Sequence, residues 1–281
     1  MFDNASQTGE PSGESSNSFP MSEAFSQLDR LVSPKSAHSI SGRLNCLCRP
    51  EVADELERIY RRHSWVYDSL AARKNVETLR GRVPVLAGSL GDADIVVKRL
   101  FHGGKLGNLW KDRFLGAARI RNHIPLAEFL NGHGIATPRV IFASWRRSWG
   151  VVRGEVGFEK LADGVDADRY LFVSEEAPRD WYEKATLIGE LVASMHRIEF
   201  VHDDLNLMNI YIDESDRLYV LDLDNSSLPR RRLGERVRRG NLARLERSIR
   251  KQGRKRARDY VEAVVEAVHD SYETAHARAN G

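Results

Sequence analysis

The pattern of hydrophobic and polar positions divides the chain into three parts. Residues 1–45 are rich in Ser, Asn, Gly and Pro and contain few large apolar side chains. Such a segment cannot bury enough apolar surface to offset the entropy that ordering costs, so we expect residues 1–45 to be disordered. Ordered structure is expected to begin near Val52, where residues 53–74 show a helical pattern.

The second part reads mainly as β-strands. Short runs of β-forming residues are bounded by Gly and Pro, among them IVVKRLF at 95–101, TPRVIFASW at 137–145 and WGVVRGEVGFEKL at 149–161. A helical segment that ends at Gly132 or Gly134 separates them. We expect residues 46–160 to form one lobe, a small antiparallel sheet of five strands with one helix against it.

The third part, residues 161–281, is mostly helical. The segment 181–198 places Ala185, Ile188, Leu191, Val192 and Met195 on one face. Two short strands, IYI and LYVLDL, then flank the turn DESD, and helical patterns return from position 236 onward. A sheet followed by helices around one hairpin predicts an α+β fold with two lobes.

Composition places few limits on function. The chain is 41% apolar and 30% charged, which is ordinary for a globular protein. No apolar run approaches the roughly 18 residues that span a bilayer, and the first residues lack the basic and apolar regions of a secretory signal. We therefore expect the protein in the cytoplasm or on the cytosolic face of a membrane.

The chemistry concentrates around the predicted hairpin, which is rich in Asp and Asn. Asp204 and Asn209 are five positions apart, and Asp222 follows thirteen positions later. Phosphoryl transfer requires a carboxylate that accepts the proton of the acceptor hydroxyl, together with oxygen ligands for Mg²⁺. A loop followed by a tight hairpin can bring these three side chains together. Their spacing matches the protein-kinase catalytic loop and the Asp of the D-F-G motif.

Two departures argue against a protein kinase. Asp203 occupies the position of the catalytic-loop Arg, which commonly pairs with a phosphorylated activation loop. The triplet Asp222-Leu223-Asp224 replaces D-F-G, and only 59 residues follow Asp222. That length is too short for an activation segment and the usual large helical lobe, so the pattern favours a compact small-molecule kinase.

Lys98, in the run IVVKRLF, is the candidate for contacting the α- and β-phosphates of a nucleotide. The alternative is a solvated lysine on an edge strand. The turn Gly81-Arg82-Val83 is a weak candidate for a reduced phosphate loop. The chain contains no G-x-x-x-x-G-K-[ST] motif, which excludes a P-loop kinase.

Five segments resemble the lipopolysaccharide kinase family of Gram-negative bacteria, and within it most closely the kinases of 3-deoxy-D-manno-octulosonic acid (Kdo). They are HGGKLGNLWKDRFLG, GHGIATPRVIFA, HDDLNLMNIYID, VLDLDNSSL and NLARLERSIRK, in the order of the family, over positions 81–251. The resemblance implies a kinase-like fold and ATP-dependent phosphorylation of a Kdo hydroxyl on a lipid A precursor at the inner membrane.

The resemblance also implies residue roles. Asp204 is then the catalytic base, Asn209 and Asp222 are Mg²⁺ ligands, and Lys98 contacts the phosphates of ATP. Relatives usually carry a helix Glu that pairs with this Lys, whereas here the position is His123, and Glu128 lies more than a turn away on the same segment. Either another carboxylate holds Lys98, or the alignment is shifted, or the enzyme is impaired.

A basic segment suggests an anionic partner. Between positions 230 and 258 there are fourteen Arg or Lys and two Glu. Leu242, Leu245 and Ile249 form an apolar stripe within it, which we expect to face the core rather than a membrane. The basic side chains then suit an anionic membrane surface or a Kdo-containing lipid. Nucleic acid is not expected, because no nucleic-acid-binding motif accompanies the charge.

Three hypotheses follow from the sequence. The first is a Kdo kinase, the second a kinase of another sugar such as a core heptose, and the third a pseudokinase or adaptor that docks on an anionic membrane through the basic segment. The set of Asp204, Asn209 and Asp222 favours an active enzyme. The sequence leaves the oligomeric state open.

Overall fold

The computed structural model describes residues 44–74, 76–79, 84–100, 114, 116–174, 176–226 and 232–278. Leu44 and Asn45, which we had placed in the disordered segment, lie in a strand. The remainder of that segment and the turn Gly81-Arg82-Val83 lie outside the described residues.

A six-stranded antiparallel sheet forms the N-terminal half, with the strand order β1-β5-β6-β4-β3-β2. Its strands are β1 (Leu44–Cys48), β2 (Glu77–Leu79), β3 (Val85–Leu90), β4 (Ala93–Arg99), β5 (Val140–Ser148) and β6 (Val151–Glu159). The sheet therefore has one strand more than the five expected. The sequence did not predict β1, because five residues at the end of a polar segment become a strand only by pairing with β5.

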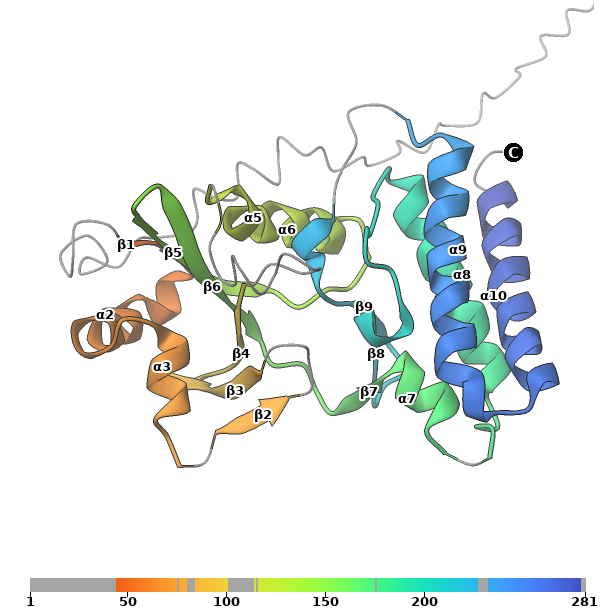
Figure 1. Cartoon of the computed structure of the whole chain (residues 1–281), viewed down its shortest axis with the longest axis horizontal. Coiled ribbons are helices and arrows are strands. Elements are labelled where there is room, and N and C mark those ends of the chain that lie inside the picture. The colour runs from red at the N-terminus through yellow and green to blue at the C-terminus, as the bar shows by residue number, and fades with distance from the viewer. Residues whose placement is uncertain are drawn as a thin grey trace, which may run out of the picture.

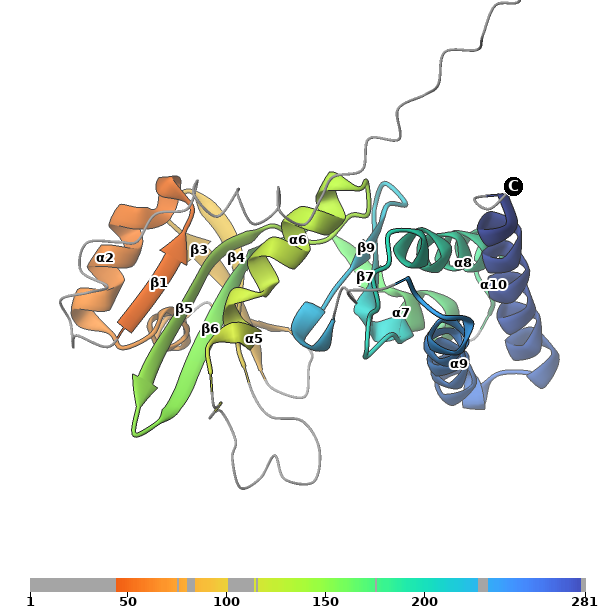
Figure 2. The same cartoon turned by 90° about the horizontal axis from the view of Figure 1, so that it is seen from above.

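Helices cover both faces of this sheet. A short 3-10 turn η3 (Pro50–Val52) leads into α2 (Ala53–Arg62) and α3 (Val66–Ala71), which pack on one face. The helices α5 (Ala118–Arg121) and α6 (His123–Gly132) pack on the other face, which looks toward the C-terminal half (Figure 2). After α6 the chain turns at Gly134, whose φ of 76° is a left-handed conformation that glycine adopts without steric cost.

The C-terminal half combines four helices with a small sheet (Figure 1). Its elements are β7 (Gly164–Asp166), α7 (Ala167–Phe172), α8 (Trp181–Arg197), η4 (Leu207–Asn209), β8 (Ile210–Asp213), β9 (Leu218–Val220), η5 (Leu223–Asn225), α9 (Glu235–Gln252), η6 (Gly253–Lys255) and α10 (Arg258–Arg278). The predicted hairpin is confirmed, since β8 and β9 pair antiparallel around the expected turn.

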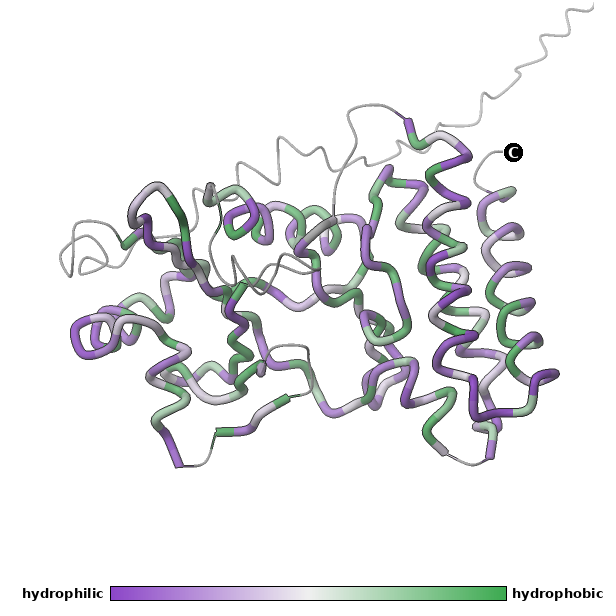
Figure 3. Tube along the Cα trace, viewed as in Figure 1, coloured by the Kyte–Doolittle hydropathy of each residue, from purple (hydrophilic) through white to green (hydrophobic). Residues whose placement is uncertain are grey.

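The helices of the C-terminal half pack through the stripes that the sequence indicated. Of the predicted face of α8, all but the half-buried Leu191 are fully buried. A Cβ on Gly189 would lie 2.3 Å from the carbonyl oxygen of Val268, so only glycine lets α8 and α10 approach this closely. The apolar stripe of α9 is buried as expected, while most of the other residues of that helix are hydrophilic (Figure 3).

One hydrophobic cluster connects the two halves. It joins residues of α6 and the sheet to residues of α7, α8, α9 and α10, so the two halves share a core rather than meeting through surface contacts. The α+β class, with an antiparallel sheet followed by a helical part, is thus confirmed. Over the described ranges of the chain, no helix is both long enough and apolar enough to cross a bilayer.

Candidate active site

A cleft of about 1460 Å³ lies between the sheet and the C-terminal half, and all four predicted site residues line it. Lys98 reaches it from β4, Asp204 and Asn209 from the loop after α8, and Asp222 from the end of β9. The fold therefore brings together side chains that are up to 124 positions apart in the sequence.

The loop that carries Asp204 is held by its own asparagines. The Nδ2 atoms of Asn206 and Asn209 both donate to the backbone carbonyl of Asp204, each over 2.8 Å. The Oδ1 atom of Asn206 also accepts a hydrogen bond from the backbone N–H of Met208, so Asn206 is the N-cap of η4. The Asp204 carboxylate is exposed, and no hydrogen bond to it is formed by the described part of the chain, so it can accept a proton from a bound hydroxyl group.

A second set of contacts fixes this loop against the segment of Asp222. The backbone N–H of Leu221 donates to the carbonyl of Asn209 over 2.9 Å, and Nε2 of the buried His202 lies 2.8 Å from the carbonyl of Leu221. Burial lowers the pKa of His202, so its ring is neutral and Nε2 carries the proton that it donates. Asp222 itself adopts a left-handed conformation with φ of 56°, which Asp tolerates better than most residues.

Buried polar side chains support His202 from the helices. Nδ2 of Asn241 donates to the backbone carbonyl of His202 over 2.7 Å, and Oδ1 of Asn241 lies 3.1 Å from Nε2 of His196. The other ring nitrogen of His196 lies 2.9 Å from the Tyr272 hydroxyl. Burial lowers the pKa of His196 to about 4, so its ring is neutral and accepts the tyrosine hydrogen bond while donating to Asn241. Helices α8, α9 and α10 thereby hold in place the loop that carries Asp204.

Lys98 lies in the middle of the sheet, because β4 pairs with β3 on one side and β6 on the other. This excludes the alternative of an edge-strand lysine. Its Nζ lies 2.7 Å from Oδ1 of Asp222 and 3.1 Å from Oδ2 of Asp224. Burial would lower the pKa of Lys98, but the charges of the two carboxylates outweigh burial and raise it, so the side chain is firmly cationic.

Helix α6 reaches Lys98 through Asp224 rather than through a glutamate. Nε2 of His123 lies 2.7 Å from Oδ1 of Asp224, and Arg119 lies 3.2 Å from its Oδ2. Burial would raise the pKa of Asp224, but the hydrogen bond from His123 and the charges of Lys98 and Arg119 hold it well below its usual range. Glu128 is not involved, because it pairs with Arg49. Of the alternatives that the sequence left open, the structure thus has Lys98 held by other carboxylates, those of Asp222 and Asp224.

The donor set suits Mg²⁺ bound together with a nucleotide. Asn209 uses its Nδ2 in the loop and Asp222 uses its Oδ1 for Lys98, so one oxygen of each, Oδ1 of Asn209 and Oδ2 of Asp222, has no partner in the described residues. The described part of the chain contains no cluster of three or more His, Cys, Asp or Glu that could hold a metal ion by itself. Mg²⁺ typically takes one or two protein oxygens and completes its shell with water and phosphate oxygens, which fits this pair.

Sequence reasoning missed several residues of the cleft. Asp224 was not identified as a partner of Lys98, nor Arg119 as a partner of Asp224, although Arg119 and His123 are four positions apart and Asp224 closes the triplet that replaces D-F-G. The helix α9 also lines the cleft with basic side chains, those of Arg244, Arg247, Arg250, Lys251 and, just beyond it, Arg254. Ser248 ties this helix to the loop by accepting from the backbone N–H of Leu207 over 3.2 Å.

The chain is similar in sequence to several proteins named 3-deoxy-D-manno-octulosonic acid kinase. The 3-deoxy-D-manno-octulosonic acid kinase of Xanthomonas euvesicatoria is 32% identical over 213 residues, 69% of this chain and 80% of that protein. The enzyme of the same name from Vibrio vulnificus (strain YJ016) is 28% identical over 208 residues, 73% of this chain and 85% of that protein. The match to the one from Pasteurella multocida, 28% identical over 164 residues, covers 56% of this chain and 65% of that protein, so the chain spans slightly under two thirds of this relative.

A solved structure of a divergent Toxoplasma kinase that lacks the glycine-rich loop superposes with a TM-score of 0.43 and 14% identity, over 91% of this chain and 85% of that chain. The sequence profile of the lipopolysaccharide kinase (Kdo/WaaP) family matches residues 66–272, which include the strands of the larger sheet other than β1, the loop that carries Asp204 and most of the helices. The chain belongs to the lipopolysaccharide kinase (Kdo/WaaP) family.

Proposed function

We propose that this protein is an ATP-dependent kinase that transfers the γ-phosphate to a hydroxyl group of Kdo on a lipid A precursor, at the cytosolic face of the inner membrane. Family membership and the Kdo kinases among its relatives support this assignment. The observation that carries it is the meeting of Lys98, Asp204 and Asp222 in one cleft. In this proposal residues 46–160 bind the nucleotide, and residues 161–281 supply the catalytic loop.

The residues of the cleft have separable roles in the transfer. Lys98 binds the α- and β-phosphates of ATP, and Asp222 and Asn209 hold Mg²⁺. When bound, Mg²⁺ neutralises phosphate charge and orients the γ-phosphate for in-line attack. Asp204 accepts the proton of the acceptor hydroxyl while the hydroxyl oxygen forms a bond to the γ-phosphorus. The bond between the γ-phosphorus and the bridging oxygen of the β-phosphate breaks, and ADP leaves.

The basic side of α9 gives the acceptor a place in the cleft. Arg244, Arg247 and Lys251 surround Ser248 at helical spacing, and Ser248 contacts the catalytic loop. None of these three cations pairs with a carboxylate in the described residues. Kdo carries a carboxylate and lipid A carries phosphates, so we assign the anionic groups of the acceptor to this row.

The test is transfer of labelled γ-phosphate from ATP with Mg²⁺ to a Kdo-bearing lipid A precursor, with a heptosylated lipid and a generic protein offered in parallel. Labelling of the Kdo lipid alone, lost in Asp222→Ala, is the expected result. Labelling of the heptosylated lipid instead would move the function to another sugar. No labelling of any acceptor, together with no binding of ATP, would contradict the assignment as a kinase.

A further inference from the structure

The β5–β6 hairpin extends beyond the rest of the sheet (Figure 2). Its turn, between Ser148 and Val151, contains the exposed Trp149. The side chain of Trp149 is 96% exposed, more than any other large hydrophobic residue in the described part of the chain. Residues 144–154, SWRRSWGVVRG, contain three Arg, two Trp and no acidic residue. The tip of the hairpin is therefore both aromatic and strongly basic.

The turn at the tip holds Trp149 in a costly conformation. Trp149 and Gly150 have φ of 50° and 76°, so both are left-handed. A two-residue hairpin turn of this kind favours Asn-Gly, and a bulky side chain at its first position is uncommon and strained. Trp145, in the same hairpin, packs against the core, whereas Trp149 packs against little. Packing within the fold does not account for Trp149, and strain of this kind points to a contact outside the chain.

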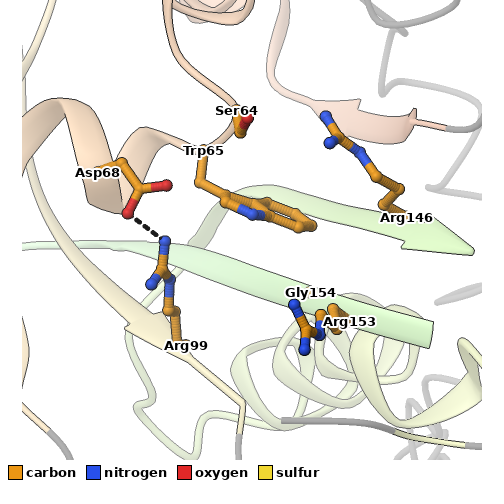
Figure 4. A pocket seen from close by; sticks show the side chains of 7 residues that line it. All are labelled: Ser64, Trp65, Asp68, Arg99, Arg146, Arg153 and Gly154. Atoms are coloured by element: carbon orange, nitrogen blue, oxygen red, sulfur yellow. Dashed lines mark hydrogen bonds and ion pairs between the residues drawn. The ribbon is translucent and has the colours of Figure 1, made fainter. Parts of the chain in front are cut away.

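A polar pocket of about 380 Å³ opens beside the outer part of the same hairpin (Figure 4). It is lined by Ser64, Trp65, Asp68, Arg99, Arg146, Arg153 and Gly154. Arg146 and Arg153 are register partners across the hairpin, so their side chains emerge on one face, three positions or about 10 Å from the turn.

The pocket carries an excess of positive charge. Its lining includes three guanidinium groups and a single carboxylate, that of Asp68, which pairs with Arg99. The guanidinium of Arg146 lies over the ring of Trp65, 5.4 Å from the centroid, and its Nε is buried without a hydrogen-bond partner in the described residues. Such a pocket suits a phosphate group, which arginine binds through paired hydrogen bonds.

We propose that the β5–β6 hairpin docks on an anionic membrane surface, with the Trp149 indole at the level of the headgroups and the arginine pocket on a lipid phosphate. Tryptophan favours the membrane–water interface because its ring is apolar while its N–H is polar, and anionic headgroups attract basic side chains. A soluble phosphate compound would explain the arginines but not an indole held in water. This inference rests on the proposed function, which places the reaction at a membrane, and it names the surface of the protein that contacts that membrane. Its test measures binding and does not require the enzyme to turn over.

The experiment measures binding of the full chain to vesicles of phosphatidylcholine, alone or mixed with phosphatidylglycerol. Trp149→Asn is the decisive variant, because Asn suits the left-handed position and keeps the fold at least as stable. We expect it to weaken binding to the mixed vesicles about tenfold or more, and Arg146→Gln with Arg153→Gln to weaken it about thirtyfold. Brominated lipids should quench tryptophan fluorescence in the parent chain and less so in Trp149→Asn.

Matched controls remove an aromatic side chain or two cationic side chains at sites outside the hairpin. Tyr182→Asn removes another aromatic side chain, 62% exposed on α8, and Arg58→Gln with Arg61→Gln removes two exposed cations on α2 of the same half. Both controls should bind the mixed vesicles like the parent chain. Unchanged binding by Trp149→Asn, or equal loss in the controls, would overturn the proposal.

Two further arms separate the alternatives. Equal binding to pure phosphatidylcholine vesicles, or displacement from mixed vesicles by inorganic phosphate at low millimolar concentration, would overturn the assignment to an anionic lipid. Phosphate transfer to the acceptor in a non-ionic detergent is measured separately, and Trp149→Asn should retain the parent rate there. Absence of transfer in the parent chain would contradict the proposed function and leave the vesicle result standing.

Discussion

Nε2 of His123 lies 2.7 Å from Oδ1 of Asp224, and the other oxygen of the same carboxylate lies 3.1 Å from Nζ of Lys98. Helix α6 therefore contacts Lys98, the proposed phosphate-binding lysine, through an intervening carboxylate. The side chain of Asp224 is 8% exposed, and among the described residues His123, Lys98 and Arg119 stabilise its charge. Three residues, His123, Asp224 and Lys98, thus connect the helix to the strand where relatives are expected to pair a helix glutamate with the lysine directly.

We predict that His123→Glu lowers kinase activity, although it restores the residue expected in relatives. A glutamate there would place a second buried carboxylate against Asp224, and like charges in a buried site repel strongly. His123→Ala should lower kcat/KM by about tenfold, the typical coupling of a buried hydrogen bond to a charged group. Initial rates at varied ATP concentration measure both effects. Glu128→Gln, on the same helix but outside the cleft, is the control, and higher activity in His123→Glu would refute this account.

Asp204→Asn should lower kcat by at least about a hundredfold, because a positioned general base contributes that much or more. Nucleotide affinity should stay within a factor of about two. Asp204 makes no contact with Lys98, which pairs with Asp222, so this substitution leaves the proposed nucleotide contacts unchanged. Single-turnover transfer and nucleotide titration separate the two quantities. Asp203→Asn, the exposed neighbour, serves as the control, and near-normal turnover in Asp204→Asn would remove Asp204 from the mechanism.

Asp222→Asn should abolish the dependence of nucleotide binding on Mg²⁺. The substitution removes the negative charge and one of the two carboxylate oxygens, so the single amide oxygen cannot serve both as the proposed metal ligand and as the 2.7 Å partner of Lys98. We expect nucleotide affinity in the parent chain to fall when Mg²⁺ is chelated, and the variant to show the low affinity with or without the metal. Calorimetric titration with and without chelator measures this. A variant that still gains affinity on adding Mg²⁺ would exclude Asp222 as a ligand.

Asn241→Leu should destabilise the protein by about 2 to 4 kcal/mol, because it leaves the buried Nε2–H of His196 unpaired and removes one of the two hydrogen bonds to the carbonyl of His202, which keeps the one from the backbone N–H of Leu205. Urea denaturation measures the loss. Ser248→Ala, which removes a half-buried contact on the same helix, should cost less. If the two variants are equally stable, the buried chain of hydrogen bonds does not support the loop as described.

The stability of the fold should depend on pH through His196. Its pKa is about 4 in the folded protein against about 6.5 in the unfolded chain, so the unfolded state binds more protons between these values. The contribution of the neutral His196 to the free energy of unfolding should therefore be fully present above pH about 6.5. It should fall by on the order of 3 kcal/mol as the pH drops to about 4. The measurement is the unfolding free energy of the parent chain minus that of His196→Gln across this range.

The difference between the two chains is needed because Glu155 titrates in the opposite sense. Burial raises the pKa of Glu155 to about 7, so its folded state binds more protons than the unfolded chain as pH falls from about 7. That contribution is common to the parent chain and His196→Gln and cancels in the difference. A flat difference would contradict the neutral, hydrogen-bonded state of His196.

The sequence by itself determined the class of the fold and the principal acidic residues. The spacing of apolar residues in a strand or helix is a local property of the sequence. The runs of β-forming residues in the sheet, the apolar face of α8 and the hairpin around DESD could therefore be predicted. The spacing of Asp204, Asn209 and Asp222 is also local, because one loop and one hairpin carry all three. The same holds for the α9 stripe, whose burial follows from Leu242, Leu245 and Ile249 at helical spacing.

Only the tertiary structure decided which distant groups meet. Lys98 and Asp224 are 126 positions apart, and nothing in either segment specifies the other, so the partner of Lys98 could not be predicted. Strand β1 and the buried chain from Tyr272 to His202 likewise depend on pairing between remote segments. The exposure of Trp149 is of the same kind, because burial depends on what the rest of the chain leaves uncovered, and a local pattern of apolar residues does not specify that.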